Sequence, residues 1–242
     1  MAHQDHFDLD IPIAIHDQLV GAFGVLRPIP LSEWDRLAAP AALGVYGLYY
    51  NGALVYVGKA DRLEKRLGEH QAKVAGRQGI SPDVVGATFL TVNPNWSAYA
   101  PETILIRHYK PLGLCEWNGG GFGNHDVGRR RDTSAPNDFD RMFPIRLDWA
   151  CTSLSAGRHV VADVLASVKA ELPFLLRYSR KRSATRALEG ATIVLDAPAP
   201  TIRDLMTLVS EEMSGWQATA LLSHIIFYPE SRSYEDAGGI VL

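Results

Sequence analysis

Strand-forming residues lie on both sides of the dipeptide Asn51-Gly52, and this pattern predicts a β-hairpin. Asn-Gly is typical of a tight turn between antiparallel strands. The flanking strand formers, which favour a pleated and partly buried surface, are Val45, Leu48, Tyr49, Leu54, Val55 and Val57. We therefore expect the segment from Gly44 to Gly58 to form two paired strands.

A helix follows the predicted hairpin. Asp61 and Glu64 have the spacing of a capping box at the start of a helix. Leu63 and Leu67 lie on its buried side. Arg66 and His70 are four residues apart and therefore project from one helical face.

A strand and a second helix come next. Residues 84–92 read as a strand, and the chain then turns at residues 93–95. The helix after this turn starts at Ser97 or Ala100, and Pro101 lies in its first turn. The dipeptide Lys110-Pro111 ends it, because proline cannot continue a helix. Glu102 therefore lies in the first turn, where an acidic side chain also suits the helix dipole.

The remaining segments carry weaker patterns. Residues 155–172 form an amphipathic pattern that predicts a helix. Residues 191–195 indicate a strand and residues 201–213 a helix, whereas the apolar run 221–228 fits either type. Prolines break residues 8–40 into short pieces, which we expect to cover one side of the sheet.

Composition narrows the class of protein. The chain has 242 residues, 47% hydrophobic and 21% charged, which is ample for a packed core. No apolar run approaches the length of a membrane span, and the N-terminus does not read as a secretory signal. Two cysteines are too few for a disulfide framework or a cysteine zinc site. We therefore expect a cytoplasmic protein without membrane association.

Charge is unevenly distributed along the chain. The net charge is −3, yet residues 44–150 carry +2 and residues 151–186 carry +5, between two acidic ends. Such segregation suits local binding to phosphate. The candidate contacts, which also fit an ordinary solvated surface, are Arg129, Arg130 and Arg131 with the later run Arg177, Arg180, Lys181, Arg182 and Arg186.

The tripeptides Gly44-Val45-Tyr46 and Tyr56-Val57-Gly58 resemble the signature of the GIY-YIG nucleases, with valine in place of isoleucine in both halves. Taken alone, both tyrosines could be ordinary strand aromatics. The resemblance extends from about Leu43 to Gly128. It implies a catalytic set made of Tyr46, Tyr56, Arg66, His70, Glu102 and Asn118.

The length of the hairpin turn decides whether the two tyrosines share a face. A two-residue turn at Asn51-Gly52 would leave Tyr46 and Tyr56 on opposite faces. A three-residue loop that includes Tyr50, with a bulge at Gly52, would place them directly opposite one another. Because the resemblance implies one shared site, we predict the second register.

The resemblance also implies the chemistry. Glu102 would bind one divalent cation, Mg²⁺, for which Mn²⁺ can substitute, and Arg66 would contact the phosphate. Tyr46 would take a proton from the attacking water, either directly as a phenolate favoured by Lys59 and other positive charge, or by relay to His70. Tyr56 would orient the phosphate and Asn118 would steady the site.

A glycine-rich segment narrows the resemblance further. Residues 121–126, Gly-Phe-Gly-Asn-His-Asp, are similar to the segment after the core in type II restriction endonucleases that cut the palindrome CCGCGG. Asn124 and His125 are its candidate DNA contacts, and Lys59 is a further candidate beside the hairpin. The resemblance implies cleavage of double-stranded DNA at a short, GC-rich palindrome by a homodimer. It also implies a cognate DNA methyltransferase in the same restriction-modification system.

Two other functions remain open from the sequence. One is a homing, repair or structure-specific nuclease of the same superfamily, and the other is a DNA-binding module without activity. The expected fold is α+β: a small, mostly antiparallel sheet flanked by helices, with a mixed C-terminal extension. Its parts are an N-terminal arm (1–42), the catalytic core (43–128), a basic linker and helix (129–186) and an acidic extension (187–242).

Overall fold

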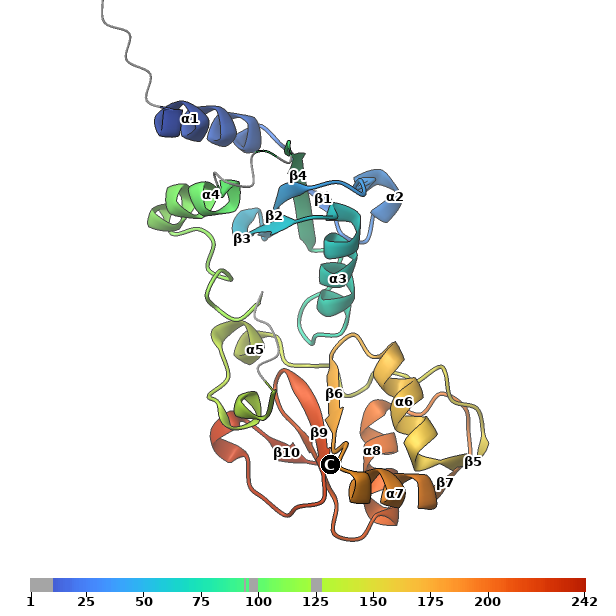
Figure 1. Ribbon diagram of the computed structural model, residues 1–242. Coiled ribbons are helices and arrows are strands. Elements are labelled where there is room, and N and C mark those ends of the chain that lie inside the picture. The colour runs from blue at the N-terminus through green and yellow to red at the C-terminus, as the bar shows by residue number, and fades with distance from the viewer. Residues whose placement is uncertain (1–10, 94, 96–99, 123–127) are drawn as a thin grey trace, which may run out of the picture. The chain divides into compact units, whose positions relative to one another are not determined.

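The computed structural model describes residues 11–93, 95, 100–122 and 128–242, and it divides into two compact units (Figure 1). Unit 1 comprises Met1–Gln71 and Pro82–Gly119. Unit 2 comprises Ala72–Ser81 and Gly120–Leu242. Each unit has its own sheet and its own buried core, so each is described by itself.

Unit 1 is built on an antiparallel sheet of four strands in the order β1-β4-β2-β3. These strands are β1 (Ile29–Pro30), β2 (Gly44–Tyr50), β3 (Ala53–Ala60) and β4 (Val85–Thr91). The helices are α1 (Ile11–Gly24), α2 (Trp34–Leu37), α3 (Leu63–Ala75) and α4 (Pro101–Tyr109), followed by the 3-10 turn η2 (Lys110–Leu112). Helices flanking an antiparallel sheet confirm the expected α+β class.

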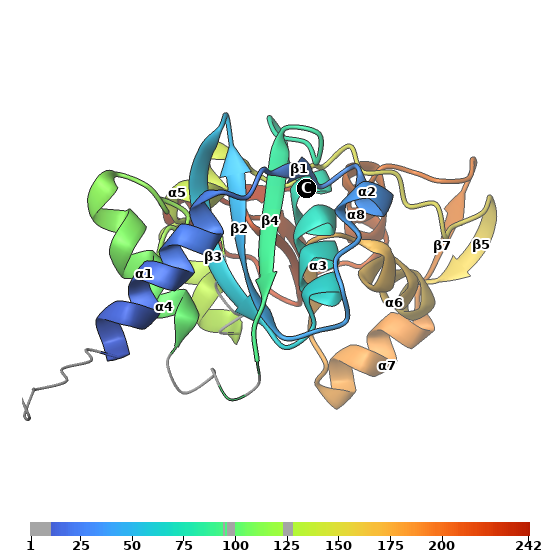
Figure 2. The same cartoon turned by 90° about the horizontal axis from the view of Figure 1, so that it is seen from above.

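The helices of unit 1 cover both faces of this sheet. Figure 2 shows α3 on one side and α1 and α4 on the other. The core between the sheet and α1 and α4 is apolar and contains Leu19, Phe23, Val45, Leu54, Val57, Leu105 and Cys115. Because side chains alternate along a strand, Tyr46 lies on the opposite face from Val45, on the side of α3.

The hairpin turn is shorter than predicted. Asn51 and Gly52 alone form it, with φ of +51° and +80°, and Tyr50 pairs with Ala53. Positive φ at both positions is what a two-residue hairpin turn requires, and asparagine and glycine accept it most readily. The predicted three-residue loop with a bulge at Gly52 is therefore wrong, as is the direct opposition of Tyr46 and Tyr56.

A bulge does occur, but inside strand β3. The register shifts between Leu48 and Tyr49, where Leu48 pairs with Tyr56 and Tyr49 pairs with Leu54, so Val55 is the extra residue. After this shift Tyr46 pairs with Gly58. Tyr46 and Tyr56 are thus diagonal neighbours on one face, which an unbulged two-residue hairpin would not allow.

The N-terminal segment contributes helix α1 and the edge strand β1 to unit 1. Helix α1 packs against α4, and Phe23 of α1 is fully buried. Strand β1 pairs with β4 and extends the sheet at its edge. The backbone amides of Leu63 and Glu64 donate to the carbonyls of Ala42 and Pro40, which fixes the start of α3. Residues 11–40 therefore supply an edge strand as well as the expected cover.

Unit 2 contains a second sheet of strands in the order β10-β8-β9-β6, in which β6 and β9 are parallel. A two-stranded sheet pairs β5 with β7. The strands are β5 (Gly157–Val160), β6 (Leu175–Tyr178), β7 (Thr192–Leu195), β8 (Gln217–Ala220), β9 (His224–Tyr228) and β10 (Ile240–Val241). The helices are α5 (Asp138–Met142), α6 (Val161–Glu171), α7 (Arg182–Gly190) and α8 (Ile202–Glu212), with the 3-10 helices η3 (Gly128–Thr133) and η4 (Glu235–Ala237).

Several predicted elements of unit 2 are confirmed and one is partly wrong. The strand at 191–195 and the helix at 201–213 match β7 and α8. The ambiguous run 221–228 contains strand β9. Within the predicted helix 155–172, residues 157–160 instead form β5, which pairs with β7, and the helix begins at Val161.

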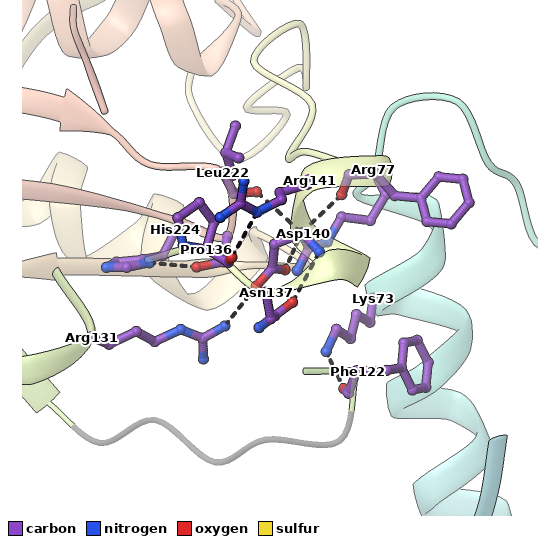
Figure 3. A network of polar contacts seen from close by, with 12 residues as sticks. Lys73, Arg77, Phe122, Arg131, Pro136, Asn137, Asp140, Arg141, Leu222 and His224 are labelled. Atoms are coloured by element: carbon purple, nitrogen blue, oxygen red, sulfur yellow. Dashed lines mark hydrogen bonds and ion pairs between the residues drawn. The ribbon is translucent and has the colours of Figure 1, made fainter. Parts of the chain in front are cut away.

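A buried polar network ties the start of unit 2 to helix α5 (Figure 3). The side chain of Arg77 is 3% exposed, and its Nη1 donates to Asp140 Oδ1 at 2.8 Å and to the Phe143 carbonyl at 3.0 Å. Arg131 approaches the other oxygen of Asp140 at 3.5 Å. A buried carboxylate is tolerated here because two guanidinium groups and the capping side chain of Asn137 surround this turn.

The two units do not follow the four predicted segments. Residues 1–42 share unit 1 with most of the catalytic core, and residues 129–186 and 187–242 share the core of unit 2. Cys115 and Cys151 are both buried free thiols. Among the described residues, no helix is long and apolar enough to span a membrane.

Candidate active site

The candidate site is centred on Tyr46, in the middle of strand β2. Its side chain is only 1% exposed, and its ring crosses the partner strand above Gly58. A Cβ atom at position 58 would overlap the Tyr46 hydroxyl and approach the Tyr56 ring to 2.8 Å. Glycine is therefore required at position 58 so that both phenol rings can lie on this face of the sheet.

Helix α3 brings His70 and Arg66 to the Tyr46 hydroxyl. His70 is 2% exposed, and its Nε2 lies 2.8 Å from Tyr46 Oη. Arg66 donates from Nε to the same oxygen at 3.3 Å and from Nη1 to Glu69 at 2.9 Å. The prediction that Arg66 and His70 project from one face of a helix is confirmed, because both reach one atom.

Tyr56 completes an aromatic cluster around this hydroxyl. Its ring centroid lies 6.1 Å from that of Tyr46 and 5.7 Å from that of His70. The His70 ring is also 5.4 Å from the Tyr46 ring. The three rings pack against one another around the Tyr46–His70 contact.

Burial sets the protonation state of Tyr46. Burial, together with the neighbouring Tyr56, raises the pKa of the Tyr46 phenol above its ordinary value, although Arg66 opposes this. Burial lowers the pKa of Arg66, but its hydrogen bonds to Tyr46 and Glu69 outweigh this, so the net shift is upward. At neutral pH the site therefore holds a neutral phenol beside a permanent cation.

A neutral phenol has one proton to donate, and His70 Nε2 is the acceptor within reach. In that arrangement the imidazole is neutral, and its proton is on Nδ1. The Tyr46–His70 contact is the geometry that a proton relay between these two residues needs. In the protein alone, burial outweighs the positive charge of Arg66, so the net shift of the Tyr46 pKa is upward.

Glu102 lies in the first turn of α4, after the left-handed residue Ala100 and the first-turn proline Pro101. Burial raises the pKa of its carboxyl group, and the positive charges of Lys59 and Arg66 oppose this shift. Glu102 therefore shares an electrostatic environment with Arg66, which in turn contacts Tyr46.

The donor chemistry at Glu102 fits a hydrated divalent cation. A half-buried carboxylate with a raised pKa is incompletely compensated by its neighbours, so additional positive charge would favour its ionised form. Mg²⁺ binds through one or two carboxylates and keeps several waters. Among the described residues, no cluster of three or more acidic, histidine or cysteine side chains could hold a metal.

Asn118 acts on the backbone of β3. Its Oδ1 accepts from the Val57 amide and its Nδ2 donates to the Val57 carbonyl, both at 2.8 Å. The amides of Cys115 and Trp117 donate to the carbonyls of Leu54 and Val55, each at 2.8 Å. The segment thus pairs with the outer edge of β3, and Asn118 fixes the residue between Tyr56 and Gly58.

Two basic residues beside the site were missed in the sequence. A depression of about 270 Å³ is lined by Ala60, Asp61, Arg62, Lys65, Arg66 and Glu69. Arg62 and Lys65 are both exposed, with Arg62 just before α3 and Lys65 in its first turn. Arg62 lies four residues before Arg66, and this spacing is the signal that could have included Arg62, whereas Lys65 directly precedes Arg66 and has no such spacing.

The predicted DNA contacts differ in whether their side chains already form ion pairs within the protein. Lys59 is exposed on β3. Arg129 pairs with Glu230 at 2.7 Å, and Arg131 pairs with Asp140, whereas Arg130 is exposed. Asn124 and His125 lie outside the described residues.

Residues 53–172 match the family model described as the Eco29kI GIY-YIG domain. The fold and this match define a GIY-YIG nuclease domain of the restriction endonuclease type. The chain belongs to the GIY-YIG nucleases. Of the candidate catalytic residues, Tyr46 precedes the matched range, which includes Tyr56, Arg66, His70, Glu102 and Asn118.

Solved structures offer a further comparison. The chain is similar to the GIY-YIG N-terminal endonuclease domain of UvrC from Thermotoga maritima, bound to its catalytic divalent cation, magnesium. The identity is 31% over 31% of this chain and 84% of that chain, with a TM-score of 0.25. A point mutant of the same UvrC domain gives 28% identity, 31% and 83% coverage, and a TM-score of 0.25. No curated protein matches the chain.

Proposed function

We propose that this protein is a type II restriction endonuclease that hydrolyses phosphodiester bonds in double-stranded DNA at a short, GC-rich palindrome. The observation that carries the proposal is the convergence of His70 Nε2 and Arg66 Nε on the buried hydroxyl of Tyr46, at 2.8 and 3.3 Å. A phenol held between an imidazole acceptor and a guanidinium is suited to proton transfer beside a phosphate.

Tyr46 and His70 act together on the attacking water. The water gives a proton to Tyr46 Oη as the phenol proton passes to His70 Nε2, so Tyr46 stays neutral overall and His70 becomes an imidazolium. The water oxygen then forms a bond to phosphorus, and the bond from phosphorus to the leaving oxygen breaks. The leaving oxygen keeps the electron pair of that bond and takes a proton from solvent. This relay avoids a free phenolate, whose formation burial disfavours.

Arg66 and Tyr56 position the phosphate. Arg66 has a planar fork of donors that suits two phosphate oxygens and stabilises the charge that develops during attack. Tyr56 packs against the Tyr46 and His70 rings, so its hydroxyl is held at a fixed place on the same face. Asn118 acts indirectly, by fixing the Val57 backbone beside it.

Glu102 is the residue that would hold the divalent cation, which we propose to be one Mg²⁺ per active site, with Mn²⁺ as a substitute. When bound, this cation neutralises phosphate charge and lowers the pKa of bound water. Lys59 adds positive charge on the same side, because it acts on the same carboxylate.

Each chain carries one candidate site of this kind, which suffices to cut one strand. A palindromic target matches two copies related by a twofold axis. We therefore propose a homodimer on DNA, working with a DNA methyltransferase that protects the same sequence.

Incubation of the purified protein with plasmid DNA tests the proposal. With Mg²⁺ we expect a discrete set of fragments, and sequencing of their ends gives the target site. With EDTA in place of Mg²⁺ we expect none. Nicking confined to branched DNA would instead support a structure-specific nuclease, and binding without cleavage would support an inactive module.

A further inference from the structure

Helix η3 in unit 2 carries three consecutive arginines whose environments differ. In a 3-10 helix, residues three apart eclipse one another, so the segment presents three faces. Arg129 and Asp132 share one face, Arg130 and Thr133 the second, and Gly128 and Arg131 the third. The contacts on each face follow this division.

The first face is anchored to the sheet. Asp132 is 1% exposed, and its carboxylate accepts from His224 Nε2 at 2.9 Å, from Tyr228 Oη at 3.3 Å and from Arg177. Arg129, on the same face, stacks over the Tyr228 ring at 4.2 Å and pairs with Glu230. Both residues therefore reach the same tyrosine of β9.

Asp132 anchors η3 to the sheet, and the charges and hydrogen bonds around this residue favour its ionised form. Burial raises the pKa of Asp132, but the hydrogen bond from His224 and the charge of Arg177 outweigh it, and the net shift is downward. Burial lowers the pKa of His224, which keeps its ring neutral. Neutral His224 then donates from Nε2 to Asp132 and accepts at Nδ1 from Ser223 Oγ, 2.8 Å away.

The other two faces differ in their contacts. Arg131 and Ser134 line a cavity of about 430 Å³, where Arg131 also approaches Asp140. Arg130 and Thr133 are exposed. The Arg130 carbonyl accepts from Ser134 Oγ at 2.6 Å, which fixes its backbone. Within the described part of the chain, Arg130 is the arginine of this triplet without an ion-pair partner.

We propose that Arg130 binds a backbone phosphate of DNA and that buried Asp132 is the positioning residue that presents it. This inference rests on the proposed nuclease function. Arg129 and Arg131 already form ion pairs within the protein. Arg130 is therefore the arginine whose guanidinium can bind a phosphate, and its own backbone is fixed. Because its backbone is fixed, only the freedom of the Arg130 side chain is lost on binding, and its planar fork of donors matches phosphate oxygens.

Binding of a labelled duplex oligonucleotide in EDTA tests this, because no strand is then cut. We expect Arg130→Gln to weaken binding to specific and unrelated duplexes by the same factor. We also expect the slope of log affinity against log salt to fall by about one. Arg158→Gln, an exposed arginine on β5, removes the same charge and should leave both quantities unchanged.

A double-mutant cycle tests the role of Asp132. Asp132→Asn should weaken DNA binding in the natural chain but add little once Arg130 is already glutamine. If Asp132→Asn does not fold, Tyr228→Phe removes one hydrogen bond of the anchor, keeps the ring under Arg129 and takes its place in the cycle. Equal losses in both backgrounds would assign Asp132 a purely structural role.

The outcomes separate the two proposals. If the unmodified protein cuts plasmid but Arg130→Gln binds with the same affinity and salt slope, the Arg130 contact is wrong and the nuclease assignment stands. If the unmodified protein neither binds nor cuts DNA, the proposed function itself fails.

Discussion

At the scale of single residues, the site depends on a glycine as much as on its reactive side chains. Gly58 lies opposite Tyr46, and the space that its Cβ would occupy is filled by the two phenol rings. The sequence motif marks this position, but only the structure gives the reason. Gly58 is needed because a side chain there would overlap the rings of Tyr46 and Tyr56.

We predict that Gly58→Ala destabilises the protein by about 1–3 kcal/mol, the usual cost of overpacking a core. It should also reduce cleavage, because the Tyr46 ring must move. Gly68→Ala is the matched control, since the nearest atom to a Cβ there is Trp34 Cη2 at 3.7 Å. In helix α3 this control should be neutral or stabilising by up to about 1 kcal/mol. Urea unfolding of both variants measures the difference, and equal stabilities would contradict this account of Gly58.

The sequence predicted the chemistry of individual residues better than their partners. Arg66 and His70 could be placed on one helix face because helix periodicity is local. The partner of Asn118 could not be predicted, because Val57 is 61 residues away in sequence and the contact depends on how the loop returns to the sheet. Likewise, nothing local indicates that Asp132 is buried under β9.

At the scale of elements, the hairpin shows which features of a strand pair a sequence can specify. Asn51-Gly52 correctly predicts a turn, and its two-residue form follows from positive φ at both positions. The bulge at Val55 has no comparable local signal, because valine is an ordinary strand residue. Tyr46 and Tyr56 do share a face, as predicted. The predicted register is wrong because it places the extra residue in the turn, whereas the extra residue lies inside strand β3.

The sheet of unit 2 should lose stability in acid through the anchor of η3. His224 has a lowered pKa in the folded chain, so the unfolded chain binds its proton first as the pH falls through about 6.5. Asp132 also has a lowered pKa, so its contribution is lost in turn below about pH 4. The free energy of unfolding should therefore fall from pH 7 to pH 5.

Urea unfolding at several pH values checks this prediction, with His224→Gln as the comparison. Glutamine keeps a donor for Asp132 but does not titrate, so the dependence on pH between 7 and 5 should flatten. All other titrating groups, including Glu102, are the same in both chains. A slope that is unchanged in His224→Gln would exclude His224 as its source.

At the scale of the whole molecule, the boundaries of the compact units do not coincide with the boundaries of the charged blocks along the sequence. The charge blocks suggested a basic linker and a separate acidic extension, yet both contribute to one hydrophobic core in unit 2. Charge reports on the surface, whereas domain boundaries follow buried apolar contacts, which only the fold assembles. Three of the eight basic candidate contacts, Arg129, Arg131 and Arg177, form ion pairs within the protein.

A mixing experiment tests the proposed homodimer. If each copy cuts one strand, wild-type protein premixed with excess Tyr46→Phe should form mixed dimers that cut one strand only. The plasmid product should shift from linear to open circular DNA. Tyr50→Phe, on the same strand but stacked on Trp117, is the matched control and should leave linear product. Linear product at every ratio with Tyr46→Phe would argue against one active site per strand.

The central claim is that Tyr46 passes a proton to His70 during phosphodiester hydrolysis. The most direct measurement is the single-turnover cleavage rate of Tyr46→Phe with DNA bound at saturation, alongside its DNA affinity. We predict that the rate falls by about 10²–10⁴, the usual contribution of general acid–base catalysis, while the affinity stays unchanged. A rate within about threefold of the wild-type value at equal affinity would contradict the account.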